Sequence, residues 1–144
     1  MLPSSVMHEW FEQVWNRGDA SAIDRLLAPD ATMHNFDQLG NDAQGSASFV
    51  ERYHRFRAAF PDLHFTLHDA FESGAYTAGR WTFTGTHTGN GLDIPPTHRK
   101  IEFAGMSFAR IENGRAAEVW DSWDANGMMK QLGRNESAMA AAAV

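Results

Sequence analysis

Apolar residues recur at intervals of three and four along the first part of the chain. Between Val6 and Trp15 this spacing predicts an amphipathic helix, and Gly18 is a typical residue to end it. Asp19 has the side chain of an N-cap for a second, short helix, which Pro29 should end. The residues expected to face the core on this second helix are Ile23, Leu26 and Leu27.

A third helix is expected from Ser46 to Phe60, with Ser46 as its cap and an apolar stripe along one side. Pro61 ends it, because proline cannot continue the hydrogen-bond ladder of a helix. Between the second and third helices, Ala31–Phe36 has the signature of a short strand. The stretch Asp37–Gly45 is rich in Gly, Asn and Asp, and it predicts a loop.

Beyond Pro61 the period changes to two, which is the signature of strands. Longer strands are expected over Tyr76–Thr88, Arg99–Ile111 and Arg115–Trp123. Asn113-Gly114 predicts a tight hairpin between the last two, because both residues tolerate positive φ. A first strand, ahead of a turn at Ser73-Gly74, has the alternating apolar residues Leu63, Phe65, Leu67 and Phe71.

After the last strand, Asp124 can cap a short helix over Ala125–Leu132. Helices first and an antiparallel meander afterwards are typical of an α+β domain, with helices packed on one face of a curved sheet. The length of 144 residues fits one domain, which we place at residues 1–134. Residues 135–144 are an Ala-rich, low-complexity tail.

The last strand carries the best candidate for chemistry. Side chains alternate between the faces of a strand, so Val119, Asp121 and Trp123 are expected to share one face with Ala117. If this apolar row faces a pocket, desolvation raises the pKa of the Asp121 carboxyl toward the range that suits proton transfer. The structural alternative is an Asp near the end of a strand that is solvated or caps the segment beginning at Ala125. Asp121 is therefore a candidate acid–base residue.

Neighbouring strands would supply the walls of such a pocket. Gly105 and Ser107 lie on one apolar strand face, where small side chains leave volume for a ligand or for a closely packed helix. His87 lies among aromatic residues and glycines at a strand end, where a structural role is the alternative to a ligand contact. The residues expected to line a substrate pocket beside Asp121 are Trp10, Met33, Asn35, Trp81, Phe83, His87, Phe103, Gly105, Ser107 and Trp123.

Composition narrows the class of ligand. Aromatic residues make up 12% of the chain, and large rings either fill a core or line pockets for flat organic molecules. The formal net charge of -6, with scattered Lys and Arg, argues against a nucleic-acid partner. No apolar stretch is long enough to cross a membrane, and the N-terminus lacks the features of a signal peptide. We therefore expect a cytoplasmic protein that binds a small hydrophobic or aromatic molecule.

Other chemistries find little support in the sequence. The chain has no cysteine, which excludes a thiol nucleophile and a Cys-based metal site. His64 and His68 share a strand face but are too far apart for an easy chelate, so no metal site is predicted. The stretch Gly85–Gly89 lacks the Lys and the following helix of a phosphate loop. No nucleophile-elbow sequence is present, which argues against a serine hydrolase.

A series of short motifs runs from about residue 10 to residue 133. In chain order they are Phe11-x3-Trp15-Asn16-x-Gly18-Asp19, Leu27-Ala28-Pro29-Asp30, Phe60-Pro61-Asp62-Leu63, Gly85-Thr86-His87-Thr88-Gly89, Pro95-Pro96-Thr97-x-Arg99, Arg110-Ile111-x-Asn113-Gly114-Arg115, Asp121-x2-Asp124 and Gln131-Leu132-Gly133. Together and in this order, they resemble the SnoaL-like polyketide (ester) cyclases of the nuclear-transport-factor-2-like superfamily.

This resemblance implies a cone-shaped, strongly curved antiparallel or mixed sheet with three N-terminal helices packed on it around a deep pocket. It also implies a homodimer formed through the sheet face, and ring closure by intramolecular aldol condensation without a metal or an organic cofactor. The acid–base Asp of the family matches Asp121. Well-studied members direct Gln and His into the pocket from the preceding strand, and the matching positions here are Gly105 and Ser107.

Three functional hypotheses follow. The first is a cofactor-independent, cyclase-like enzyme that acts on an aromatic or polyketide-like ester or ketone. The second is a hydrolase similar to the epoxide-hydrolysing relatives, which hold a water between two carboxylates bridged by Arg. Arg80 would have to reach Asp121 for this, and strand parity places Arg80 on the opposite face. The third is a non-catalytic module that binds a small molecule in the same pocket.

Overall fold

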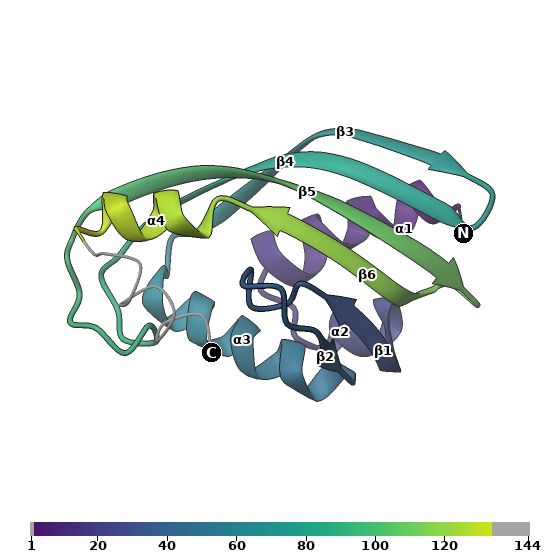
Figure 1. The fold of residues 1–144 in the computed structure, drawn as a ribbon, viewed down its shortest axis with the longest axis horizontal. Helices are drawn as coiled ribbons and strands as arrows, with labels where there is room; N and C mark the ends of the chain where they lie inside the picture. Colours follow the sequence, from purple (N-terminus) through teal and green to yellow (C-terminus); the bar gives the residue numbers. More distant parts are fainter. Residues whose placement is uncertain (1, 134–144) are drawn as a thin grey trace.

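The computed structural model describes residues 2–133, which form one curved, six-stranded sheet with helices on its concave face (Figure 1). The strand order is β2-β1-β6-β5-β4-β3, and all neighbours are antiparallel except β1 and β6, which are parallel. The sheet is open, with β2 and β3 at its edges. The strands are β1 (Leu27–His34), β2 (Ala43–Gln44), β3 (His64–Ser73), β4 (Tyr76–Thr86), β5 (Lys100–Glu112) and β6 (Arg115–Trp123).

The first predicted helix is two joined segments. The α-helix α1 (Pro3–Glu9) continues into η1 (Trp10–Asn16), a π-helical segment whose wider turn ends with Arg17 N–H donating to the Glu12 carbonyl at 2.9 Å. The helices α2 (Ser21–Leu26) and α3 (Ser46–Ala59) complete the layer beneath the sheet, and α4 (Ala125–Gln131) follows β6 (Figure 1). The expected α+β fold, with three N-terminal helices on a curved, mixed sheet, is confirmed.

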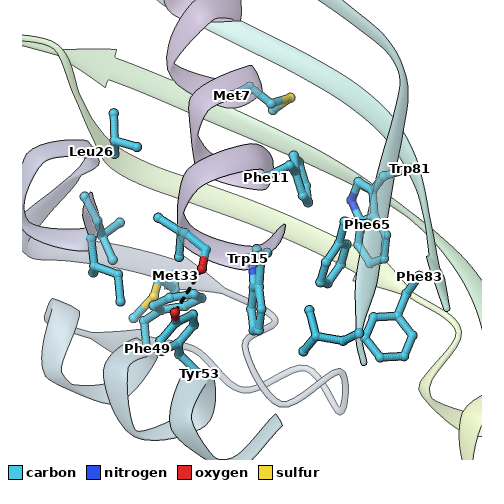
Figure 2. Packing of buried hydrophobic residues seen from close by; sticks show 14 of the residues in the cluster. Met7, Phe11, Trp15, Leu26, Met33, Phe49, Tyr53, Phe65, Trp81 and Phe83 are labelled. Carbon is cyan, nitrogen blue, oxygen red and sulfur yellow. Dashed lines mark hydrogen bonds between the residues drawn. The ribbon is translucent and has the colours of Figure 1, made fainter. Parts of the chain in front are cut away.

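Aromatic side chains join the helical layer to the sheet. The Trp15 ring on η1 packs against Tyr53 on α3 and Phe65 on β3, with ring centroids 5.1 and 5.0 Å away. The buried Tyr53 hydroxyl donates to the Val14 carbonyl at 2.9 Å, shown as the dashed line in Figure 2. Each such buried ring contributes about 1.5–3 kcal/mol relative to an exposed one. This packing holds the helices at a fixed distance from the sheet.

Two β-bulges change which residues face inward. A register shift between Leu67 and Asp69 turns the Phe71 side chain outward, where it is 72% exposed, and Ala70 packs against the core instead. A second shift pairs Ile111 with Ala116, so Ala116 rather than Ala117 faces inward. The expectations for Phe71 and Ala117 are wrong because one extra residue in a strand reverses the alternation of its side chains.

Several predicted element boundaries are corrected. Leu27 begins β1, and Pro29 lies inside this strand rather than ending a helix. The ladder between β1 and β6 is interrupted between Leu27 and Thr32, so the missing amide hydrogen of proline costs no sheet hydrogen bond there. Ser46 is the first residue of α3 and makes no capping hydrogen bond, because Gly45, with φ 93°, precedes the helix.

Of the remaining predictions about element ends, two boundaries are wrong, and the last hairpin and the cap of α4 are confirmed. The strand β2 lies within the stretch that was expected to be a loop, and β4 ends at Thr86, two residues early. The hairpin at Asn113-Gly114 is confirmed, with φ of 53° and 76°. Asp124 caps α4, because its Oδ1 accepts the Gly127 N–H at 2.9 Å. The tail predicted at residues 135–144 lies outside the described residues.

No helix among residues 2–133 combines the length and the apolar character needed to cross a membrane.

Candidate active site

A cavity of about 120 Å³ lies between the concave face of the sheet and the helices. Most of its wall is apolar, and it is unusually rich in rings. Among the described residues of the wall, only Asp121 and Arg52 carry a charge. The aromatic residues of the wall are Trp10, Phe11, Trp15, Phe36, Phe49, Phe56, Phe65, Trp81, Phe103 and Trp123.

The Asp121 carboxyl group is held by a short chain of hydrogen bonds across three strands. Ser107 on β5 lies directly opposite Asp121 on β6, and its hydroxyl is 2.5 Å from Asp121 Oδ1. The indole nitrogen of Trp81 on β4 donates to the same Ser107 oxygen at 3.0 Å. Because an indole N–H can only donate, Ser107 accepts from Trp81 and directs its own proton to Asp121.

The environment of Asp121 raises its pKa above the ordinary value of 3.8. Burial is the largest cause, since it disfavours the charged form. The hydrogen bond from Ser107 and the positive charge of Arg52 act in the opposite direction and favour the carboxylate. A carboxyl with a raised pKa is suited to take up and return a proton nearer to neutral pH.

Gly105 has a different role from the one expected. It pairs with Trp81 on one side and with Trp123 on the other. A Cβ at Gly105 would lie 2.4 Å from Cζ2 of Trp81 and 2.7 Å from the Trp123 Cβ. The volume that a side chain would fill at Gly105 is therefore occupied by the Trp81 ring, which crosses this position to reach Ser107. Gly105 is not among the residues that line this cavity.

Arg52 on α3 is a member of the site that the sequence analysis missed. Its guanidinium carbon lies 3.7 Å from the centroid of the Phe36 ring, and its Nη1 donates to the Phe36 carbonyl. Burial lowers the pKa of Arg52 to about 10. A signal was present in the sequence, since Arg52 is three residues after Phe49 and four before Phe56, on the apolar stripe of the helix.

The loop after β1 holds the backbone around Asp121. The side-chain amides of Asn35 and Gln38 both donate to the Asp121 carbonyl at 3.2 Å, and Gln38 Oε1 accepts the Trp123 N–H at 2.9 Å. The strand β1 ends at His34, so these two amides replace its backbone as partners of β6. Asn35 therefore holds the backbone of Asp121 and is not among the residues that line the cavity.

Two more residues expected in the pocket lie outside its wall. Phe83 is fully buried and stacks on Phe103, with ring centroids 4.6 Å apart, so it belongs to the core. His87 is also fully buried, and its Nδ1 accepts the Thr97 N–H at 3.2 Å. It lies beyond the end of β4 and packs against Phe60, with ring centroids 5.6 Å apart. The predicted residues that do lie in the wall with Asp121 are Trp10, Met33, Trp81, Phe103, Ser107 and Trp123.

The residues that other chemistries would need are placed elsewhere. Arg80, required by the hydrolase hypothesis, forms an ion pair with Asp69, with Nη2 and Oδ2 2.8 Å apart. In the part of the chain that the structure describes, no three His, Asp or Glu side chains are grouped so that they could hold a metal ion.

The chain is similar to a known protein family in sequence and to several solved structures in fold. The sequence model of the SnoaL-like polyketide cyclase family matches residues 5–132. IdmH from Streptomyces antibioticus, a proposed polyketide cyclase, is 28% identical with a TM-score of 0.80, and the match covers 92% of this chain and 99% of IdmH. AclR from Streptomyces galilaeus, a proposed hydroxylase, is 26% identical with a TM-score of 0.80, over 91% of this chain and 80% of AclR.

A proposed SnoaL-like polyketide cyclase from Jannaschia sp. CCS1 shares the fold at 15% identity, with a TM-score of 0.78 over 90% of each chain. Among curated protein sequences, none matches this chain.

Proposed function

Because the chain belongs to the SnoaL-like polyketide cyclase family, we propose that Asp121 is the acid–base catalyst of a ring closure on an aromatic or polyketide-like ester or ketone. The family supports a cyclase-type function. The role of Asp121 and the class of substrate are our inference from the site.

One observation carries this proposal, namely a carboxyl group that opens into an apolar cavity with one oxygen already engaged. Ser107 occupies Oδ1 of Asp121, and no other described residue donates a hydrogen bond to this carboxyl group. Oδ2 is then the oxygen that can take a proton from a bound molecule. The chain of Trp81, Ser107 and Asp121 limits rotation of the carboxyl group, and such positioning is a large part of what an enzyme contributes.

The reaction balances with this single group. The Asp121 carboxylate removes a proton from a carbon flanked by carbonyl groups, and the electron pair of the broken C–H bond becomes an enolate. The enolate carbon attacks a second carbonyl carbon of the same molecule, forming the C–C bond of the new ring and an alkoxide. The protonated Asp121 then gives its proton to the alkoxide and returns to the carboxylate. No electrons enter or leave, so no oxidant or reductant is required.

The cavity volume bears on how the substrate is held. An apolar cavity of roughly 150 Å³ is known to bind benzene, so a cavity of about 120 Å³ accommodates a group of about one ring. We infer that the segment that cyclises enters beside Asp121. A substrate with several rings would extend beyond the cavity or widen it.

The hydrolase hypothesis receives less support from the site. It requires two carboxylates around a water, and Asp121 is the only carboxylate among the described residues of the wall. The fold alone does not select a reaction, and AclR, with the same fold, is described as a proposed hydroxylase. The binding-module hypothesis differs from ours only in whether a bound molecule is converted.

Replacement of Asp121 tests the proposal. A panel of aromatic ketones and polyketide-like methyl esters would be incubated with the protein, and products would be identified by mass spectrometry. We expect Asp121→Asn to lower turnover by about 10²–10⁴-fold, the usual contribution of an acid–base group, with ligand affinity changed only a few-fold.

Glu118→Gln is the matched control for this test. It makes the same acid-to-amide change on the same strand, three residues away, and we expect it to retain turnover within about twofold. Full turnover in Asp121→Asn would refute the acid–base role. Binding without product for every ligand of the panel would favour the binding-module hypothesis.

A further inference from the structure

We propose that Trp81 is a positioning residue that acts on Asp121 through the Ser107 hydroxyl, and that it confines the transferred proton to Oδ2 of Asp121. This inference rests on the proposed function and specifies which atom of the site carries the proton. Trp81 exerts this effect without touching the reacting atoms, because it passes through the hydroxyl group of Ser107.

The Trp81 ring is fixed by its neighbours. Its side chain is 5% exposed, and the ring packs against Phe65 and Phe11, with ring centroids 5.2 and 5.9 Å away (Figure 2). Among the described residues, Ser107 Oγ is the acceptor of the indole N–H, at 3.0 Å. Because a buried donor without an acceptor is unfavourable, this hydrogen bond keeps Trp81 and Ser107 together.

A serine hydroxyl has one proton and can direct it toward either of two neighbours. Here one direction is excluded, because an indole N–H only donates and cannot accept the proton of Ser107. Ser107 therefore donates to Oδ1 of Asp121, at 2.5 Å, whether the carboxyl group is ionised or neutral. A second proton on Oδ1 would compete with this one for the same short contact. The proton that Asp121 takes up therefore resides on Oδ2.

Trp81 thus gives the two oxygens of the carboxyl group different tasks. Oδ1 is held by Ser107 in both protonation states, and Oδ2 exchanges a proton with a bound molecule. Without the indole N–H, Ser107 can rotate and accept a proton from Oδ1, and the acid then directs its proton toward β5 instead of the substrate. This alternative also stabilises the neutral form, so loss of the N–H should raise the pKa of Asp121.

The residues on β5 are those that this arrangement requires. The resemblance to the cyclases implies Gln and His at the positions of Gly105 and Ser107. A Cβ at Gly105 would lie 2.4 Å from Cζ2 of Trp81, so any side chain there would displace the indole ring. Ser107 is short enough for its hydroxyl to lie between Trp81 and Asp121. In this chain, Trp81 and Ser107 together therefore take the place of a polar pair on β5.

A double-mutant cycle of Trp81→Phe and Ser107→Ala tests this role through the pKa of Asp121. Carboxyl ¹³C NMR of the full chain with labelled Asp follows the titration, and the signal is assigned by its absence in Asp121→Asn. Trp81→Phe should raise the pKa by at least about half a unit more when Ser107 is present than in the Ser107→Ala background. The indole N–H acts on Asp121 only through the hydroxyl, so its removal has no such effect in that background.

Trp123→Phe is the matched control for the loss of an indole ring. Trp123 lies in the same wall and pairs with Gly105 from the side opposite Trp81. The hydrogen bonds of the Ser107 hydroxyl among the described residues are those with Trp81 and Asp121. The effect of Trp123→Phe on the pKa should therefore agree within about 0.3 unit with and without Ser107. Equal effects of Trp81→Phe in the two backgrounds would overturn the proposal.

A measurement on the wild-type chain keeps the proposal falsifiable if Trp81→Phe does not fold. The chemical shift of the Trp81 indole proton should titrate with the pKa of Asp121, because neighbouring hydrogen bonds in a chain polarise one another. This titration should be absent in Asp121→Asn. An indole proton that does not respond to the ionisation of Asp121 would overturn the proposal. None of these readouts uses a substrate, so full turnover in Asp121→Asn would refute the catalytic role and leave the hydrogen-bond result standing.

Discussion

Two carboxylates three residues apart on β6 occupy opposite environments. Glu118 lies on the convex face of the sheet, where His34 Nε2 is 2.6 Å from one of its oxygens and Arg110 Nε is 3.4 Å from the other. These hydrogen bonds, with that from His34 the larger, lower the pKa of Glu118. Asp121 lies on the concave face, and burial raises its pKa.

The two environments differ in how many partners each carboxyl group already has, and this separates a carboxylate with a structural role from a candidate for catalysis. Glu118 is hydrogen-bonded to the Arg110 guanidinium and to the His34 ring, and His34 also contacts Asp42 at 3.1 Å and stacks on Trp120. Among the described residues, the one side chain that donates a hydrogen bond to the Asp121 carboxyl group is the neutral hydroxyl of Ser107. A carboxyl group with a raised pKa in a cavity is a typical acid–base candidate, whereas a paired surface carboxylate contributes mainly to local structure.

The same contrast extends to the aromatic residues of the two faces. On the concave face the rings are buried in the core and the cavity wall. On the convex face Phe71, Ala78, Phe108, Trp120 and His34 are successive cross-strand partners, and they form one row over five strands. Phe71 and Phe108 in this row are 72% and 42% exposed, and we propose that a second copy of the chain covers it.

After Asp121→Asn itself, the largest effect is expected from a charge placed in the convex row. Phe108→Glu should weaken a homodimer by at least about 100-fold, because burying an unpaired carboxylate at an apolar interface is costly. Analytical ultracentrifugation would measure the dissociation constant of the dimer. Thr88→Glu, an exposed position in the loop after β4, should leave the association unchanged. A wild-type chain that stays monomeric at high micromolar concentration would contradict this proposal.

An intermediate effect is expected from Ser107→Ala on the concave face. It removes the hydrogen bond that favours the Asp121 carboxylate, so the pKa of Asp121 rises further. Turnover should fall about tenfold, and the acid limb of its pH profile should move to higher pH, because less of the base is ionised at a given pH.

Ser107→Thr retains the hydroxyl group and should recover most of the activity. His34→Gln, which removes a partner of Glu118 on the convex face, should leave the profile in place. An unchanged profile in Ser107→Ala would show that Ser107 does not set the state of Asp121.

The concave face was predictable from the sequence where the strands are regular. Between β4 and β6 the register is continuous from Trp81 through Gly105 to Trp123. Strand parity placed Gly105 and Ser107 on one face of their strand, and the family resemblance implied that this face lies near Asp121. Parity failed at the bulges near Phe71 and Ala117, because no local signal marks an extra residue.

The remaining features of the site depend on contacts between segments far apart in the chain. The small residue Gly105 leaves volume that the sequence could assign either to a ligand or to a closely packed helix, whereas the Trp81 ring fills it. Only the packed structure reveals which side chain enters such a gap. Gln38 reaches β6 because β1 stops short, and Arg52 enters the cavity because Phe36 is there to hold it. The sequence did contain a signal for Arg52, because it is an Arg within the apolar stripe of the third helix.

The smallest effects are expected in the free energy of unfolding, which should depend on pH differently in Asp121→Asn and in Glu118→Gln. Because the pKa of Asp121 is raised in the folded protein, folding is favoured while this group is neutral, and the advantage is lost as the pH rises through the folded pKa. Asp121→Asn cannot ionise, so we expect it to be more stable than the wild type at neutral pH. The gain should be about 0.5–2 kcal/mol, as is usual when a functional residue is replaced by a stabilising one, and it should vanish below pH 3.8.

Glu118→Gln should behave in the opposite way. The lowered pKa of Glu118 stabilises the fold above its ordinary value of 4.5, and this contribution is lost as the pH falls. The raised pKa of His34 stabilises the fold below its ordinary value of 6.5, and this contribution is lost as the pH rises. Glu118→Gln should therefore lower the melting temperature most between these two values. Thermal unfolding followed by circular dichroism up to about pH 8 would compare both variants with the wild type. Parallel pH curves for the two would contradict the assignment of one carboxylate to chemistry and the other to structure.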